Sequence, residues 1–264
     1  MTALRRIAPG RVAAVTWPLA FGVAFLAAWE FLVWGAGLEP YFLPAPSAIA
    51  SAFADNIGVI TEATLHSGTN ALIGLVVGTT AGIAASFALV RFRLLTELVT
   101  PLAVALNAVP IVVLITVFIN MYGSTTEVPR RLMVALIVFF IVLVNVAKGL
   151  RQVHPIHLEL LRSCAASPGA VLVKARIPNA VPYLFTALKI AAPASVITAF
   201  VAEYFGGRQV GLGTRITSNF ANSKNAVAWA YVLGACLLGL AFYLISIAME
   251  STTRQRRGPA PGGA

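Results

Sequence analysis

Apolar residues fill six long runs of the chain, and the charged residues gather in the short segments between them. A helix needs about 20 consecutive apolar residues to cross the hydrocarbon core of a bilayer. The runs are too long and too uniformly apolar for barrel strands, which alternate over about 10 residues. The pattern therefore predicts an all-α integral membrane protein with six transmembrane helices, at residues 12–37, 65–90, 98–123, 132–147, 182–206 and 226–249.

Three acidic or basic residues of the Asp, Glu, Lys and Arg types lie inside these predicted spans, namely Glu30, Lys189 and Glu203. Charged groups inside a membrane are costly, so each is a functional candidate by default. All three lie near a helix end, where a long side chain can also reach the membrane surface. The sequence leaves both interpretations open. The fourth span is the shortest, because Arg131 and Lys148 bound it.

The positions of Lys and Arg predict the orientation of the spans, because cytoplasmic segments carry an excess of both. With the N-terminus inside, most of the 19 Lys and Arg residues fall on the inner side, and residues 38–64 carry none. We therefore expect both termini in the cytoplasm, with residues 1–11 as a cytoplasmic start, 12–250 as the membrane domain and 251–264 as a disordered tail. Residues 38–64 are mildly amphipathic, which predicts a helix on the outer surface.

Composition excludes several other classes of protein. The chain is 59% hydrophobic and 11% charged, with a mean hydropathy of +0.86, whereas soluble domains carry about 25% charged residues. A soluble enzyme, a disordered tail and a disulfide scaffold are excluded. The net charge of +10 would suit nucleic acid. However, the charges form small clusters between apolar runs and no basic face, so we expect no nucleic-acid partner.

The sequence lacks the common catalytic motifs. It has no Gly-Lys dipeptide, so it has no phosphate-binding Walker A loop. His66, His154 and His157 form no HExxH pair, no GxSxG is present, and Cys164 and Cys236 have no metal-binding spacing. We therefore expect a protein that is not an enzyme and that itself binds no metal or cofactor.

A stripe of glycines in the second predicted span indicates close helix packing. Gly74, Gly78 and Gly82 are spaced four apart, which lets two helix backbones approach each other. The favoured interpretation is packing within the protomer, and a contact between protomers is the alternative.

The third predicted span contains Pro101, Asn107 and Pro110. A proline leaves a backbone carbonyl without its helical partner, which a membrane protein tolerates where that carbonyl is buried in protein or faces a cavity. This predicts a kinked, pore-lining helix. Asn107, Pro110 and Glu203 are therefore candidates for a translocation pathway.

The basic segment 149–182, between the fourth and fifth spans, is the most informative part of the chain. Pro155 suits the first turn of a helix. Ile156, Leu160 and Leu161 would form an apolar stripe along that helix.

A second short helix follows within residues 149–182. Ser167 and Pro168 are typical of an N-cap and a first helical position. This helix should end before Pro178, because the residue before a proline disfavours helical geometry. The resulting helix–turn–helix cannot bury its own apolar stripe, so a cytoplasmic partner is expected.

Residues 149–182 resemble the EAA motif of permease subunits of binding-protein-dependent ABC importers. Because this resemblance implies a role in coupling to an ATPase, we call residues 149–182 the coupling segment below. That motif has a Glu followed by two alanines, then a glycine, an apolar residue and two prolines four apart. These places are taken in order by Glu159, Ala165, Ile177, Pro178 and Pro182.

The sequence departs from the motif where Leu160 and Leu161 replace the alanines and Ala165 replaces the glycine. Five other segments also resemble this family, in the same order along residues 41–250. They point to the subgroup of permeases for sulfonate, taurine, nitrate and vitamin precursors. The segments are LPAPSAI at 43–49, PIVVLITVFINMYG at 110–123, ALKIAA at 187–192, VAEYF at 201–205 and GLG at 211–213.

The resemblance implies a type I ABC importer permease in the bacterial cytoplasmic (inner) membrane. Two copies, expected as a homodimer among membrane lipids, would form the pathway for a small solute such as a sulfonate-like anion or a vitamin precursor. An extracytoplasmic binding protein would deliver the solute, and a cytoplasmic ABC ATPase dimer would bind ATP and Mg. The residues implied in coupling are Glu159, Leu160, Leu161, Ala165, Ser167, Pro168, Gly169, Pro178 and Pro182.

Two other classes compete with this interpretation. A secondary transporter driven by an ion gradient would be expected to show inverted repeats or a charged pair at mid-membrane, and neither is evident in the sequence. A membrane enzyme or scaffold is disfavoured because no catalytic constellation is present. Removing the coupling segment should abolish transport only in an ATP-driven importer.

Overall fold

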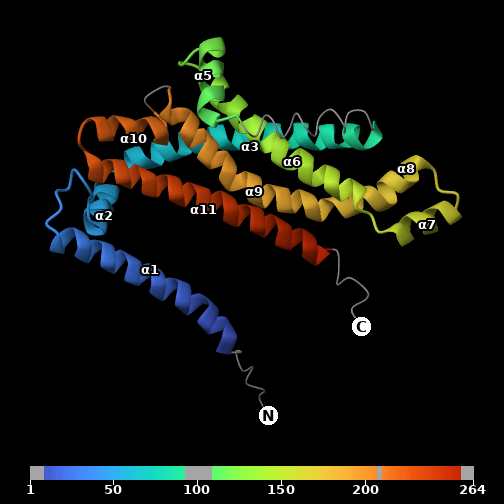
Figure 1. Ribbon diagram of the computed structural model, residues 1–264, viewed down its shortest axis with the longest axis horizontal. Coiled ribbons are helices and arrows are strands. Elements are labelled where there is room, and N and C mark those ends of the chain that lie inside the picture. Colours follow the sequence, from blue (N-terminus) through green and yellow to red (C-terminus); the bar gives the residue numbers. More distant parts are fainter. Residues whose placement is uncertain (1–8, 93–108, 207–209, 257–264) are drawn as a thin grey trace.

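The computed structural model describes residues 9–92, 109–206 and 210–256, and every regular element in these ranges is helical (Figure 1). The all-α fold is thus confirmed. The elements are α1 (Pro9–Gly35), α2 (Pro46–Asp55), α3 (Ile57–Arg91), α5 (Ile111–Tyr122), α6 (Val128–Arg151), α7 (Pro155–Ser163), α8 (Pro168–Val171), the π-helical turn η1 (Leu172–Arg176), α9 (Ile177–Tyr204), α10 (Leu212–Ala221) and α11 (Asn225–Arg256).

Five of the described helices are long and apolar enough to cross a membrane, namely α1, α3, α6, the continuous α8–α9 unit and α11. The third predicted span is represented by the shorter α5, which begins after Pro110 and ends at Gly123, where φ is +83°. Its N-terminal part, with Pro101 and Asn107, lies outside the described residues.

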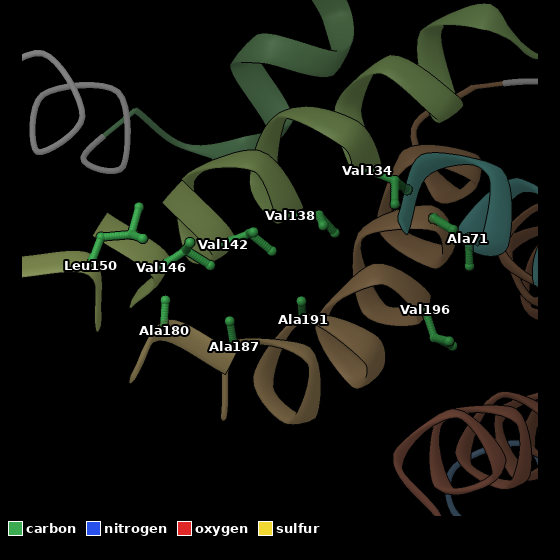
Figure 2. Packing of buried hydrophobic residues seen from close by; sticks show 11 residues of the cluster. Ala71, Val134, Val138, Val142, Val146, Leu150, Ala180, Ala187, Ala191 and Val196 are labelled. Atoms are coloured by element: carbon green, nitrogen blue, oxygen red, sulfur yellow. The ribbon is translucent and has the colours of Figure 1, made fainter. Parts of the chain in front are cut away.

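The core lies where α6 packs between α3 and α9. Figure 2 shows valines of α6, such as Val138 and Val142, facing small residues of α9, such as Ala187 and Ala191. Alanine allows the two helices to approach closely, and the valines fill the space between them. The packed helices α6 and α9 run along the bundle from one end to the other (Figure 1).

The glycine stripe of α3 packs on α6 of the same chain. A Cβ atom on Gly78 would lie 2.5 Å from the carbonyl oxygen of Ala135. Gly74 and Gly82 likewise leave no room for a side chain against α6. The stripe therefore brings two helices of one protomer together.

The outer helices present apolar side chains to the surroundings. Only 6% of the apolar stretch of α1 is buried, and Trp17, Phe31 and Trp34 are exposed on this helix. In Figure 1, most of α1 lies away from the other long helices. It meets the rest of the bundle at α2 and where Trp29 stacks edge-on against Trp229 of α11, with ring centroids 5.5 Å apart. Such a surface would be unfavourable in water, so it fits a membrane or a neighbouring protein.

Two helices extend beyond the spans predicted from the sequence. The second long helix begins at Ile57 rather than at residue 65, so the separate short helix within residues 38–64 is only α2. The fourth helix runs over Val128–Arg151 rather than 132–147. Its N-terminal arginines do not end it, because Arg130 is buried and bonded to backbone carbonyls and a carboxylate.

The prediction that the second short helix of the coupling segment ends before Pro178 is wrong. The chain passes from α8 through η1 into α9 without a break, and Pro178 and Pro182 lie inside the helical run. At η1 the hydrogen bonding widens, so that the Ile177 N–H donates to the carbonyl of Leu172 five residues earlier. A π-turn of this kind absorbs the distortion that a proline causes in a helix.

Candidate functional site

The helix α7 projects from one end of the bundle and buries none of its residues (Figure 1). Ile156 and Leu160 are 62% and 63% exposed, and Glu159 is exposed beside them. Two residues of the apolar stripe predicted from the sequence, Ile156 and Leu160, thus have no cover within the described chain, whereas the third, Leu161, is half-buried. A groove of about 760 Å³ separates α7 and η1 from the end of α3, with Phe87 and Val90 on its α3 side.

The turn after α7 explains why a glycine is usual in the motif that the segment resembles. Ala165 has a φ of +50°. Its N–H donates to the carbonyl of Arg162, and the Ala166 N–H donates to the carbonyl of Leu161 at 2.9 Å. This pair of bonds is a Schellman motif, in which the residue with left-handed geometry is usually glycine. Ala165 therefore takes up a conformation that favours a residue without a side chain.

The second helix of the coupling segment begins as predicted. The Ser167 hydroxyl accepts a hydrogen bond from the Ala170 N–H at 3.3 Å, and Pro168 takes the first helical position. Gly169 faces open space, so nothing at that position excludes a side chain.

The base of the coupling segment is cross-linked by Asn179. Its side-chain amide donates to the carbonyl oxygens of Gly149 at 2.7 Å and Gln152 at 3.1 Å. The Tyr183 hydroxyl donates to the Gln152 side chain at 2.9 Å. Gly149 also brings α6 against α9, because a Cβ there would lie 2.8 Å from the Cα of Ala180. The end of α6 and the start of α9 are therefore held as one unit.

At the opposite end of the bundle, Glu203 of α9 is 1% exposed and bonded within the chain. Its Oε2 accepts from the Ser67 hydroxyl at 2.6 Å and from the Gly213 N–H at 3.2 Å. The Ser67 oxygen accepts in turn from the Leu212 N–H at 2.9 Å. Side chains on Gly211 or Gly213 would overlap Glu203 or its backbone. The GLG sequence is thus packed directly on this carboxylate.

A second, half-buried carboxylate lies beside the first. The Arg130 guanidinium, 2% exposed, donates to Glu127 Oε2 at 2.7 Å, and the Asn70 amide donates to the same oxygen at 3.0 Å. Burial raises the pKa of Glu127. The hydrogen bond and charge of Arg130, the charge of His66 and the hydrogen bond from Asn70 together lower it more, so the pKa lies below its ordinary value. The other Arg130 bonds go to the carbonyls of Ser124, Thr126 and Gly206.

His66 lies between the two carboxylates. Its Nε2 is 3.4 Å from Glu127 Oε1, and its Nδ1 is 3.8 Å from Glu203 Oε1. We call His66, Ser67, Asn70, Glu127, Arg130 and Glu203 the polar cluster. Of these, sequence reasoning singled out only Glu203 as a site residue. Three polar residues within one turn of the apolar helix α3, at 66, 67 and 70, are the signal that could have indicated the rest.

The other predicted site residues lie apart from one another. The Glu30 carboxylate accepts from the Ser47 N–H at 3.0 Å and the Ser47 hydroxyl at 2.7 Å, which ties α1 to the start of α2. Lys189 forms a 2.8 Å ion pair with Glu250 and so joins α9 to α11. Pro110 is exposed at the start of α5, and Asn107 lies outside the described residues. No group of three metal-binding side chains occurs among the residues that were described.

A polytopic helical bundle with a projecting, rigidly based α7 defines a membrane transport subunit. The chain belongs to the family of binding-protein-dependent transport system inner membrane components, whose family model matches residues 74–255. That range includes most of the core, the entire coupling segment and Glu127, Arg130 and Glu203 of the polar cluster.

Known relatives agree with this family. The formylaminopyrimidine transport permease protein ThiX of Halalkalibacterium halodurans is 27% identical over 74% of this chain and 78% of its own length. A probable ABC transporter permease of Haemophilus influenzae is 24% identical over 86% and 91%. The riboflavin transport system permease protein RibX of Chloroflexus aurantiacus is 25% identical over 84% and 83%. The chain is therefore an ABC importer permease for a small solute and a multi-pass inner-membrane protein, not itself an enzyme.

Proposed function

We propose that two copies of this chain form the translocation pathway of an ATP-driven importer, and that α7 is the element on which a cytoplasmic ABC ATPase docks. The observation that carries the proposal is the exposed stripe of Ile156 and Leu160 on a helix that buries nothing. This assignment places α7 and both termini in the cytoplasm and the polar cluster on the outer side. ATP and Mg would bind to the ATPase and not to this chain.

The base of the coupling segment supports this role. A force applied to α7 reaches α6 and α9 together, because Asn179 bonds the end of one to the start of the other. Rigid elements of this kind can convert closure of an ATPase into helix movement. Residues 149–182 would act as the coupling unit of a membrane domain at 12–250, with 1–11 and 251–264 as cytoplasmic ends.

The solute is proposed at the level of a class. Relatives are named for formylaminopyrimidine, riboflavin and, over a shorter match of 108 residues at 32% identity, bicarbonate. We propose a vitamin precursor or a small anion, such as a sulfonate, taurine or nitrate, delivered by an extracytoplasmic binding protein. Asn107 and Pro110 remain candidates for the pathway. The contacts of Glu203 favour a structural role over direct contact with solute.

The test is co-purification of the ATPase with the tagged chain in mild detergent. Leu160→Glu places a charge on the exposed stripe and should abolish co-purification while the chain remains folded. Ile57→Glu is the matched control, because Ile57 is 51% exposed at the opposite end of the bundle. An ATPase retained equally by both variants would contradict docking at α7.

A further inference from the structure

We propose that His66, as an imidazolium, is the ionic link that holds α3, α6 and α9 together at the end of the bundle away from α7. His66 belongs to α3, whereas Glu127 immediately precedes α6 and Glu203 lies near the end of α9. The link concerns how the bundle opens, and only its assignment to the outer, solute-receiving side rests on the proposed function.

Both nitrogens of the His66 ring face a carboxylate oxygen. A neutral imidazole has one N–H donor and one lone pair, whereas the protonated ring has two donors. In the neutral form one ring nitrogen would direct its lone pair at Glu127 or at Glu203, which is repulsive. Glu127 Oε1 and Glu203 Oε1 also have no closer hydrogen-bond partner in the described structure. The imidazolium is therefore the form that fits the site.

The charge balance of the cluster leads to the same form. Glu127 and Glu203 contribute two negative charges, and Arg130 contributes one positive charge within the same buried region. Arg131 is turned toward Asn70, to which its Nε donates at 3.0 Å. A buried carboxylate without a counter-charge is strongly unfavourable. A proton on His66 supplies the second positive charge.

The link also fixes the turn between α9 and α10. The Leu212 N–H donates to the Ser67 hydroxyl, and the Gly213 N–H donates to the Glu203 carboxylate. Ser67 follows His66 in the sequence, and Glu203 lies beside His66 in space. When His66 loses its proton, the attraction between α3 and Glu203 weakens, and this turn is held only by its hydrogen bonds to Ser67 and Glu203. The link is therefore intact at lower pH and is lost as the pH rises.

Distances between α6 and α10 test the proposal on the purified full chain. Spin labels go at Val128 on α6 and Phe220 on α10, both exposed, after Cys164 and Cys236 are replaced by serine. Labelled chain is diluted with unlabelled chain so that only distances within one protomer are measured. Measurements at about pH 6 and about pH 9 span the range in which imidazole usually titrates.

We expect one short distance at the lower pH and an added longer-distance population at the higher pH. His66→Gln should show the longer population at both pH values, and His66→Arg, a permanent cation, should show the short distance at both. Glu62→Gln, an exposed carboxylate on the same helix, is the matched control and should respond like the unmodified chain.

Two results would overturn the link. One is a distance distribution in the unmodified chain that is the same at both pH values, which decides the matter even if a variant does not fold. The other is a pH response that persists in His66→Gln. Neither measurement involves the ATPase, so failure of the link and failure of docking at α7 are distinguishable.

Discussion

The backbone N–H of Ala166 donates to the carbonyl of Leu161 across a turn in which Ala165 is left-handed. This bond ends α7 and directs the chain into α8. The orientation of the projecting helix thus depends on one residue with an unfavourable backbone conformation.

Substitution of Ala165 tests this dependence. Left-handed geometry costs a residue with a side chain about 1–2 kcal/mol, and Ala→Gly costs about 0.4–1 kcal/mol through the unfolded chain. Ala165→Gly should therefore leave thermal stability unchanged or slightly raised. Ala165→Val should lower the melting temperature and weaken ATPase co-purification, because a β-branched residue fits this geometry worst. Equal tolerance of both variants would show that the turn does not set the position of α7.

The glycine stripe predicts a contrast between two substitutions of one type. Gly78→Ala should destabilise the chain by about 1–3 kcal/mol, the usual cost of overpacking, because its Cβ would press on the backbone of α6. Gly239→Ala on α11 has nothing within 4 Å, and it should be neutral or stabilising by up to about 1 kcal/mol. Thermal unfolding of the two purified variants in one detergent measures the contrast. A Gly78→Ala protein as stable as Gly239→Ala would contradict the packing.

Loss of the Asn179 side chain should weaken the transmission of movement from α7 to α6 and α9 without affecting the docking of the ATPase on α7. Asn179→Ala removes the bonds to Gly149 and Gln152, each worth about 1 kcal/mol, and leaves the exposed face of α7 unchanged. We expect the ATPase to co-purify normally, while hydrogen exchange increases at the end of α6 and the start of α9. Tyr183→Phe, which removes only the bond to the Gln152 side chain, should have a smaller effect. Unchanged exchange in Asn179→Ala would show that the base does not depend on this residue.

The low pKa of Glu127 predicts how stability responds to acid. Because the folded chain lowers this pKa below the ordinary value of 4.5, the stabilisation from Arg130 is fully present above that value. It is lost as the pH falls through the lowered pKa. The unmodified chain should therefore melt at a higher temperature than Glu127→Gln at mildly acid pH, where His66 is also protonated, and the two melting temperatures should converge only in stronger acid. A difference that has already vanished at mildly acid pH would contradict the prediction.

Features encoded by local pattern could be predicted from the sequence. Uniformly apolar runs indicated the long helices, and the four-residue spacing of Gly74, Gly78 and Gly82 indicated a close helix contact. The exposed stripe at Ile156 and Leu160 followed from helical periodicity in a segment too short to bury it.

Features that depend on tertiary contacts could not be predicted in the same way. The polar cluster draws residues from three separated helices, so no local spacing reveals it. The burial of Arg130 could not be predicted, because it depends on carbonyls as distant in sequence as that of Gly206. Pro178 predicted a helix end, because a proline usually disfavours helical geometry in the residue before it. The sequence does not show that the π-helical turn η1 lets the helix continue through this proline.

The most direct test of the account is a photo-activated cross-linking residue placed at Leu160 of the intact chain in native membranes. The account predicts a cross-link to an ATP-binding protein of the ABC class, and none to that protein from the same residue at Ile57. If Leu160 captures no ATP-binding protein, and uptake collapses when the ion gradient is dissipated, the chain is a secondary transporter and the assignment of α7 as a docking helix is wrong.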